Sequence, residues 1–72
     1  MFVEINGANY NMYSISSFKA LDTIVENSDH TQVTKYQIVY VSVSGSTLIE
    51  NFPTKADRDE KYETLQSEFL VK

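Results

Sequence analysis

One short segment of the sequence holds three residue types that could together carry out nucleophilic chemistry, Ser28, Asp29 and His30. The serine could act as a nucleophile, the histidine as its base and the aspartate as the group that orients the imidazole. The base must reach the nucleophile in space, however, and residues two positions apart in a loop do not meet that requirement. We therefore interpret His30, the only histidine in the chain, as a solvated loop residue.

Metal and phosphate chemistry also lack a suitable pattern of residues. The acidic run at positions 57–60 superficially suggests a cation site, but it lacks the alternating oxygen ligands and the central glycine of an EF-hand loop. Zinc is disfavoured because the sequence has one histidine and no cysteine. The two glycines, Gly7 and Gly45, lie in separate predicted turns, so no glycine-rich phosphate loop can form. We expect no catalytic residue, no metal, no cofactor and no enzymatic activity.

The aromatic residues are the unusual feature, with five tyrosines and four phenylalanines. Tyrosine suits protein interfaces because it combines a large apolar body with a polar tip. On the surface of a sheet, tyrosine can also stack a nucleobase. For the second use, the candidate ligand-binding residues are Tyr10, Tyr13, Tyr36 and Tyr40 for stacking, with Lys19, Lys35 or Arg58 for phosphate contact.

Length and charge limit the remaining possibilities. The chain has 72 residues and a net charge of -4, so we expect one small domain over residues 1–72 that does not bind double-stranded nucleic acid. No apolar run is long enough to span a membrane and no signal-peptide pattern opens the chain, which favours a cytoplasmic protein with no membrane partner. Cores of this size rarely supply more than about 3–5 kcal/mol of net stability. We therefore expect a homo-oligomer or a complex with a host protein.

The amino-terminal half predicts strands around two turns. Asn6-Gly7 favours a two-residue hairpin turn between strands at 2–5 and 8–11, the second continuing to about Tyr13. After an irregular bend near 15–17, residues 18–26 predict a strand, although apolar spacings of three to four residues leave a short helix over 15–25 as the alternative. A polar loop at 27–31 follows.

The carboxy-terminal half predicts a hairpin and then a helix. Residues 33–43 and 47–52 form two strands around the turn Ser44-Gly45-Ser46, and Pro53 ends the second strand. Thr54 is the expected helix N-cap, and residues 55–70 predict a helix that carries an apolar stripe of Tyr62, Leu65 and Phe69.

The predicted fold class is α+β: the two hairpins, one at the amino-terminal end and one over 33–52, form a four-stranded antiparallel sheet, with the C-terminal helix packed on one face. One short helix leaves the other face of such a sheet partly uncovered, and exposed apolar surface usually marks a contact site. The alternation along 33–43 does not say which set of side chains the helix covers. The expected interface residues are Tyr36, Ile38, Val39, Tyr40 and Val41.

In size, acidity and order of elements, the chain is similar to the small accessory proteins common in phage genomes. That resemblance implies an accessory or regulatory role. From the residues, we expect a non-enzymatic protein-interaction module that associates with itself through a sheet face or edge. The alternative is an oligomer that sequesters a nucleotide-like ligand between its subunits.

Overall fold

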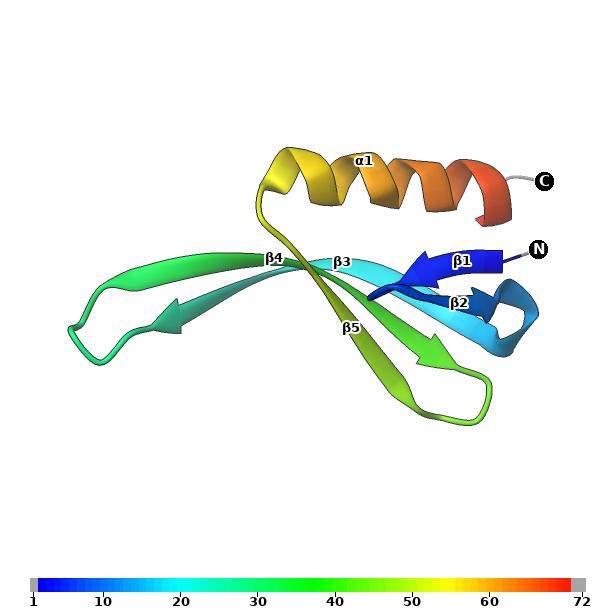
Figure 1. The fold of residues 1–72 in the computed structure, drawn as a ribbon, viewed down its shortest axis with the longest axis horizontal. Coiled ribbons are helices and arrows are strands. Elements are labelled where there is room, and N and C mark those ends of the chain that lie inside the picture. Colours follow the sequence, from blue (N-terminus) through cyan, green and yellow to red (C-terminus); the bar gives the residue numbers. More distant parts are fainter. Residues whose placement is uncertain (1, 71–72) are drawn as a thin grey trace.

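The computed structural model describes residues 2–70, with side chains as far as Glu68, and has an α+β fold. Five antiparallel strands form two sheets, and the C-terminal helix packs on them (Figure 1). The strands are β1 (Phe2–Ile5), β2 (Ala8–Asn11), β3 (Ile15–Glu26), β4 (Gln32–Ser42) and β5 (Thr47–Phe52). The helix α1 (Lys55–Leu65) is followed by one π-helical turn, Gln66–Leu70.

The first hairpin, β1–β2, confirms the prediction from Asn6-Gly7. Its register pairs Val3 with Tyr10 and Ile5 with Ala8. Asn6 and Gly7 both have positive φ, 54° and 83°, which is the backbone that a two-residue hairpin turn of this kind requires. The register places Val3 and Ile5 on the same face, so this hairpin adds two apolar side chains to the core.

The prediction of four strands in one sheet is wrong on both counts: β3 is a fifth strand, and the chain leaves the first hairpin before β3 begins. A 3₁₀ turn, Met12–Ser14, ends β2; it is held by Asn11, whose side chain accepts a bond from the Tyr13 N–H at 2.9 Å. The hairpin β1–β2 is therefore a separate two-stranded sheet, and β3 pairs with β4 in a three-stranded sheet of order β3-β4-β5. The helical alternative for 15–25 is also wrong, since β3 is extended from Ile15 to Glu26.

Helix α1 begins where the sequence predicts. The Thr54 hydroxyl accepts a hydrogen bond from the Asp57 N–H at 3.1 Å, as an N-cap residue does. The regular α-helix ends at Leu65, five residues earlier than predicted, and continues as the π-helical turn. Of the predicted apolar stripe, Leu65 is buried and Tyr62 is half-buried, while the side chain of Phe69 lies outside the described residues.

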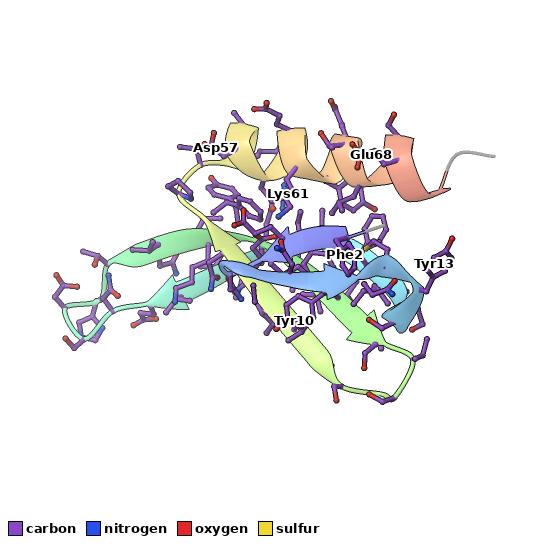
Figure 2. The ribbon with its side chains drawn as sticks, turned by 45° about the vertical axis from the view of Figure 1, so that its right-hand side comes forward. Phe2, Tyr10, Tyr13, Asp57, Lys61 and Glu68 are labelled. Carbon is purple, nitrogen blue, oxygen red and sulfur yellow. The ribbon has the colours of Figure 1, made fainter. Side chains whose placement is uncertain are left out.

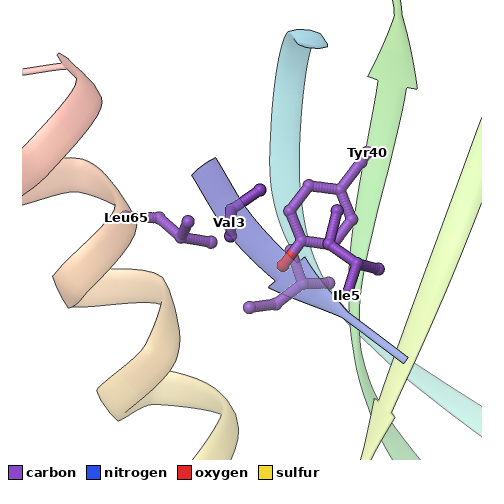
Figure 3. Close-up of a cluster of buried hydrophobic side chains, with 5 residues drawn as sticks. Val3, Ile5, Tyr40 and Leu65 are labelled. Carbon is purple, nitrogen blue, oxygen red and sulfur yellow. The ribbon is translucent and has the colours of Figure 1, made fainter. Parts of the chain in front are cut away.

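The core lies between α1, the first hairpin and the inner face of the three-stranded sheet. Its buried members among the described side chains are Val3, Ile5, Ile38, Tyr40 and Leu65. Figure 3 shows Val3 of β1 between Leu65 of the helix and Tyr40 of β4. The first hairpin therefore fills the space that one short helix leaves open on this face.

The ribbon formed by β3 and β4 extends well beyond the rest of the molecule. Strand β5 pairs with β4 only from Tyr36 to Val41, so residues 23–35, which we call the arm, form a two-stranded ribbon with no third strand. Figure 1 shows the arm projecting from the end of the sheet, away from the helix. The molecule is consequently elongated, measuring 44 × 25 × 20 Å. None of its described helices is long and apolar enough to cross a membrane.

Candidate interaction surface

The three-stranded sheet has one covered and one uncovered face. On β4, Tyr36, Ile38 and Tyr40 point to the inner face, toward α1, and the intervening residues point to the opposite face, which we call the outer face. No other described element packs on the outer face. It carries six apolar side chains, from all three strands: Leu21, Val25, Val33, Val39, Val41 and Ile49.

Exposure along the outer face is substantial for aliphatic side chains. Leu21 is 41% exposed, and Val33 and Ile49 are each 46% exposed. The other three apolar residues of this face are half-buried by their neighbours in the sheet. Two of them, Val39 and Val41, are among the predicted interface residues, and they lie where a second chain can reach them.

The other predicted interface residues lie on the inner face. Ile38 and Tyr40 have no exposed surface, so they belong to the core of this chain and are not a surface for a second one. The reason is that α1 and β1 both pack against this side of β4. Tyr36 is half-buried, with its ring centre 5.8 Å from the guanidinium carbon of Arg58.

A polar network, which the sequence did not predict, connects the elements on the covered face. The Tyr40 hydroxyl donates to Glu50 Oε1 at 2.7 Å, and Lys61 Nζ donates to Glu50 Oε2 at 2.9 Å. Lys61 also donates to the carbonyl oxygen of Glu4. Burial, together with the neighbouring Glu50 carboxylate, raises the pKa of Tyr40 far above its ordinary value. This network joins β1, β4, β5 and α1, so its first role is structural.

Arg58 is bound by two carboxylates and one backbone carbonyl of the chain. Its side chain is only 5% exposed; Nη1 donates to Asp22 Oδ1 at 2.7 Å and to the Leu21 carbonyl at 3.1 Å. Nε donates to Asp59 Oδ1 at 2.7 Å. The hydrogen bond to Asp59 is the main reason that the pKa of Arg58 is raised. The contact between Arg58 and a phosphate stays a prediction; in this fold two carboxylates already pair with the guanidinium.

The other predicted ligand-binding residues do not converge within one chain. Tyr10 is half-buried and packs against the core, whereas Tyr13 is 84% exposed on the 3₁₀ turn. Figure 2 shows Tyr13 at the end of the molecule opposite to the arm. Lys35 belongs to the arm and is exposed. A tyrosine that stacks a base and a lysine that contacts its phosphate would therefore have to come from two different subunits.

The tip of the arm is a tight polar turn. His30 has a left-handed backbone, with φ of 69°, and its Nδ1 lies 3.1 Å from Glu26 Oε1. The hydroxyl and N–H of Thr31 donate to Asp29, and the hydroxyl bond is the main cause of the lowered pKa of Asp29. The side chain of His30 is 89% exposed, which confirms the prediction of a solvated loop histidine.

An open depression of about 470 Å³ lies where β5 meets the start of α1. It is lined by Phe52, Pro53, Asp57, Glu60, Lys61 and Thr64. Lys61, the cation of this lining, is already paired with Glu50. Among the described side chains, no three histidine, aspartate or glutamate residues gather as metal ligands. Comparison with protein families, curated proteins and solved structures finds no match to this chain.

Proposed function

We propose that this chain is a small non-enzymatic interaction module that associates with a second copy of itself through the outer face or the open edge of the β3-β4-β5 sheet. The observation that carries the proposal is the row of exposed apolar side chains on that outer face. Exposed apolar surface of this kind is the ordinary mark of a contact site.

The size of the core supports the same proposal. Among the described side chains, five residues form the fully buried apolar cluster, and cysteine is absent from the sequence, so no disulfide adds to it. Domains this small commonly gain their remaining stability from oligomerisation. The accessory or regulatory role suggested by the resemblance to small phage proteins is compatible with such a module, because its activity would consist of binding.

The test is the mass of the protein in solution over a range of concentrations, measured by native mass spectrometry and by light scattering after gel filtration. We expect a mass of at least twice the 8.2 kDa of one chain. A species that remains monomeric at the highest soluble concentration would refute the proposal.

A pair of variants tests the contribution of the outer face. Ile49→Glu places a charge on this face, on the strand farthest from β3, and should weaken association if the face is buried. Gln66→Glu is the matched control, because it introduces the same charge at an exposed position after α1. Equal masses for the two variants would show that association does not use the outer face at Ile49.

The second candidate, a nucleotide-like ligand held between subunits, is supported by Tyr13 and Lys35. Both are exposed; Tyr13 lies on the 3₁₀ turn at the end of the molecule opposite to the arm, and Lys35 belongs to the arm, so we expect a second copy to bring them together. The same native mass spectra decide: a fixed extra mass per oligomer supports a bound ligand, and loss of that mass in Tyr13→Ala would place the ligand at this tyrosine. An oligomer without extra mass after gentle purification contradicts the candidate.

A further inference from the structure

We propose that two copies of the chain pair antiparallel along their β3 edges, with Leu21 on the two-fold axis. The two three-stranded sheets then form one sheet of six strands. This inference rests on the proposed self-association and specifies the surface and the register that it uses.

The two edges of the three-stranded sheet differ in ways that favour β3. Strand β5 has six residues and ends at Pro53, and the side chain of Asn6 donates to its Ile49 carbonyl at 2.9 Å. Strand β3 has twelve residues, and no described strand pairs with its outer side. A long edge with free N–H and C=O groups is a template for pairing with another chain.

The hydrogen-bonding phase of β3 determines which of its peptide groups are free. Beyond the strand end, Asn27 N–H donates to the Thr31 carbonyl, in the same register as the β3–β4 pairs. Since antiparallel pairs alternate, the odd-numbered residues of β3 from Ser17 onward direct their N–H and C=O groups toward β4. The even-numbered residues, from Phe18 to Glu26, direct theirs toward the open edge. Five consecutive alternate residues can therefore bond a second copy.

A two-fold axis permits several registers of β3–β3 pairing, and the side chains that face each other favour one of them. Pairing centred on Leu21 brings the two leucines together on the outer face and puts Ile24 opposite Phe18 on the inner face. Pairing centred on Asp22 would put two carboxylates directly opposite each other, and like charges in that position are destabilising. Pairing centred on Ala20 would put Asp22 opposite Phe18. The Leu21 register places Asp22 opposite the small side chain of Ala20, whereas a register centred on Thr23 would place Asp22 opposite Ile24. We therefore favour the Leu21 register, in which the large apolar residues Leu21, Phe18 and Ile24 face one another and no like charges are opposed.

The same register supports the arm, which one chain alone leaves unsupported. Isolated two-stranded hairpins are marginally stable in water. In the proposed dimer, residues 23–26 of each arm pair with residues 16–19 of the other copy. Ile24, which is 66% exposed, then lies beside Phe18 of the second copy. That phenylalanine packs edge-to-face on Tyr62 at 5.6 Å, so the arm extends an existing core.

Disulfide trapping tests the register directly because the sequence contains no cysteine. In the proposed pairing, the two Leu21 residues form a pair without mutual hydrogen bonds, with Cα atoms about 4.5 Å apart. That separation is within the range of disulfides. We expect Leu21→Cys, under mild oxidation, to run as a covalent dimer on a non-reducing gel. Leu21 is 41% exposed, so its substitution should leave the fold intact, which circular dichroism would check.

Two further single-cysteine variants provide the control on the same strand. Lys19 lies opposite Thr23 in the proposed register, so Lys19→Cys and Thr23→Cys should each cross-link poorly alone and efficiently when mixed. A protein that is dimeric by light scattering but cross-links Lys19→Cys alone as well as Leu21→Cys, or cross-links neither, would overturn the β3 pairing and leave self-association standing. A protein that is monomeric would overturn both proposals.

Discussion

Tyr40→Phe removes one oxygen atom from the centre of the protein, and its cost can be worked out from the contacts. Tyr40 has no exposed surface, and its hydroxyl donates to the Glu50 carboxylate at 2.7 Å. The Glu50 side chain is only 12% exposed, so little water is at hand to replace the lost donor. Hydrogen bonds to charged groups contribute about 1.5–3 kcal/mol. Because Lys61 still pairs with Glu50 after the substitution, we expect a loss of about 2 kcal/mol in the free energy of unfolding.

The assay is urea unfolding followed by circular dichroism, at one fixed protein concentration because an oligomer's stability depends on concentration. A loss of this size would lower the thermal midpoint by roughly 8–16 °C in a domain of this length. Tyr13→Phe is the matched control: Tyr13 is 84% exposed, and its variant should stay within about 0.5 kcal/mol of the parent. If Tyr40→Phe also stays within that margin, the network contributes no stability and the reasoning from its geometry fails.

The same substitution has a pH dependence with a defined sign. The pKa of Tyr40 is raised in the folded state from its ordinary value of 10.0, so the folded protein holds the proton more tightly than the unfolded chain. This contribution is complete below about pH 10 and declines at higher pH, by up to about 1.4 kcal/mol per pH unit. The stability difference between the parent and Tyr40→Phe should therefore shrink above pH 10. A difference that is constant from pH 8 to pH 11 would contradict the assignment.

Three other substitutions, the first with its own control, probe separate parts of the fold. Leu65→Ala leaves a cavity in place of a side chain that is 2% exposed and should lower the free energy of unfolding in denaturant by about 2–5 kcal/mol. Its control is Val43→Ala, at a side chain that is 69% exposed, which should lower that free energy by less than about 0.5 kcal/mol. Thr54→Ala removes the helix N-cap and should lower the unfolding free energy by about 1 kcal/mol; no measurable loss would mean that the cap does not stabilise α1. Gly7→Ala meets no atom within 4 Å, so its expected cost of about 1 kcal/mol comes from the positive φ of 83° alone, and an unchanged thermal midpoint would argue against the left-handed turn.

Elements specified by local residues could be predicted from the sequence. Asn6-Gly7 predicts the first hairpin because few other residue pairs adopt two positive φ values, and Thr54 predicts the start of α1 because its hydroxyl reaches the third helical N–H. Both signals act within a few residues, so they need no knowledge of the rest of the chain. The number of sheets was not predictable in this way, since it depends on whether β3 pairs with β2 or with β4.

The identity of the buried face was open because β4 is apolar on both sides. Tyr36, Ile38 and Tyr40 alternate with a set that includes two valines, Val39 and Val41, and periodicity alone does not distinguish the two sets. A neighbouring strand did hold a usable signal. On β5, Glu50 lies between Leu48 and Phe52 at alternate positions, so a carboxylate on the apolar face indicates buried partners for it. Its partners, Tyr40 and Lys61, lie on other elements and could not be named from sequence.

Arg58 links the covered half of the molecule to the arm, and this explains why a cation is buried in α1. Its guanidinium reaches from the first turn of the helix to Asp22 and the Leu21 carbonyl, next to the point where the arm leaves the sheet. At this point the ribbon loses its third strand, because β5 ends its pairing with β4 at Tyr36. The bonds from Arg58 to β3, together with the face of Tyr36 beneath it, hold the ribbon against the helix. Since these bonds use the side chain of Asp22 and a carbonyl directed toward β4, they leave the outward peptide groups of β3 free. The helix can therefore fix the direction of the arm without blocking the edge through which we propose that a second copy binds.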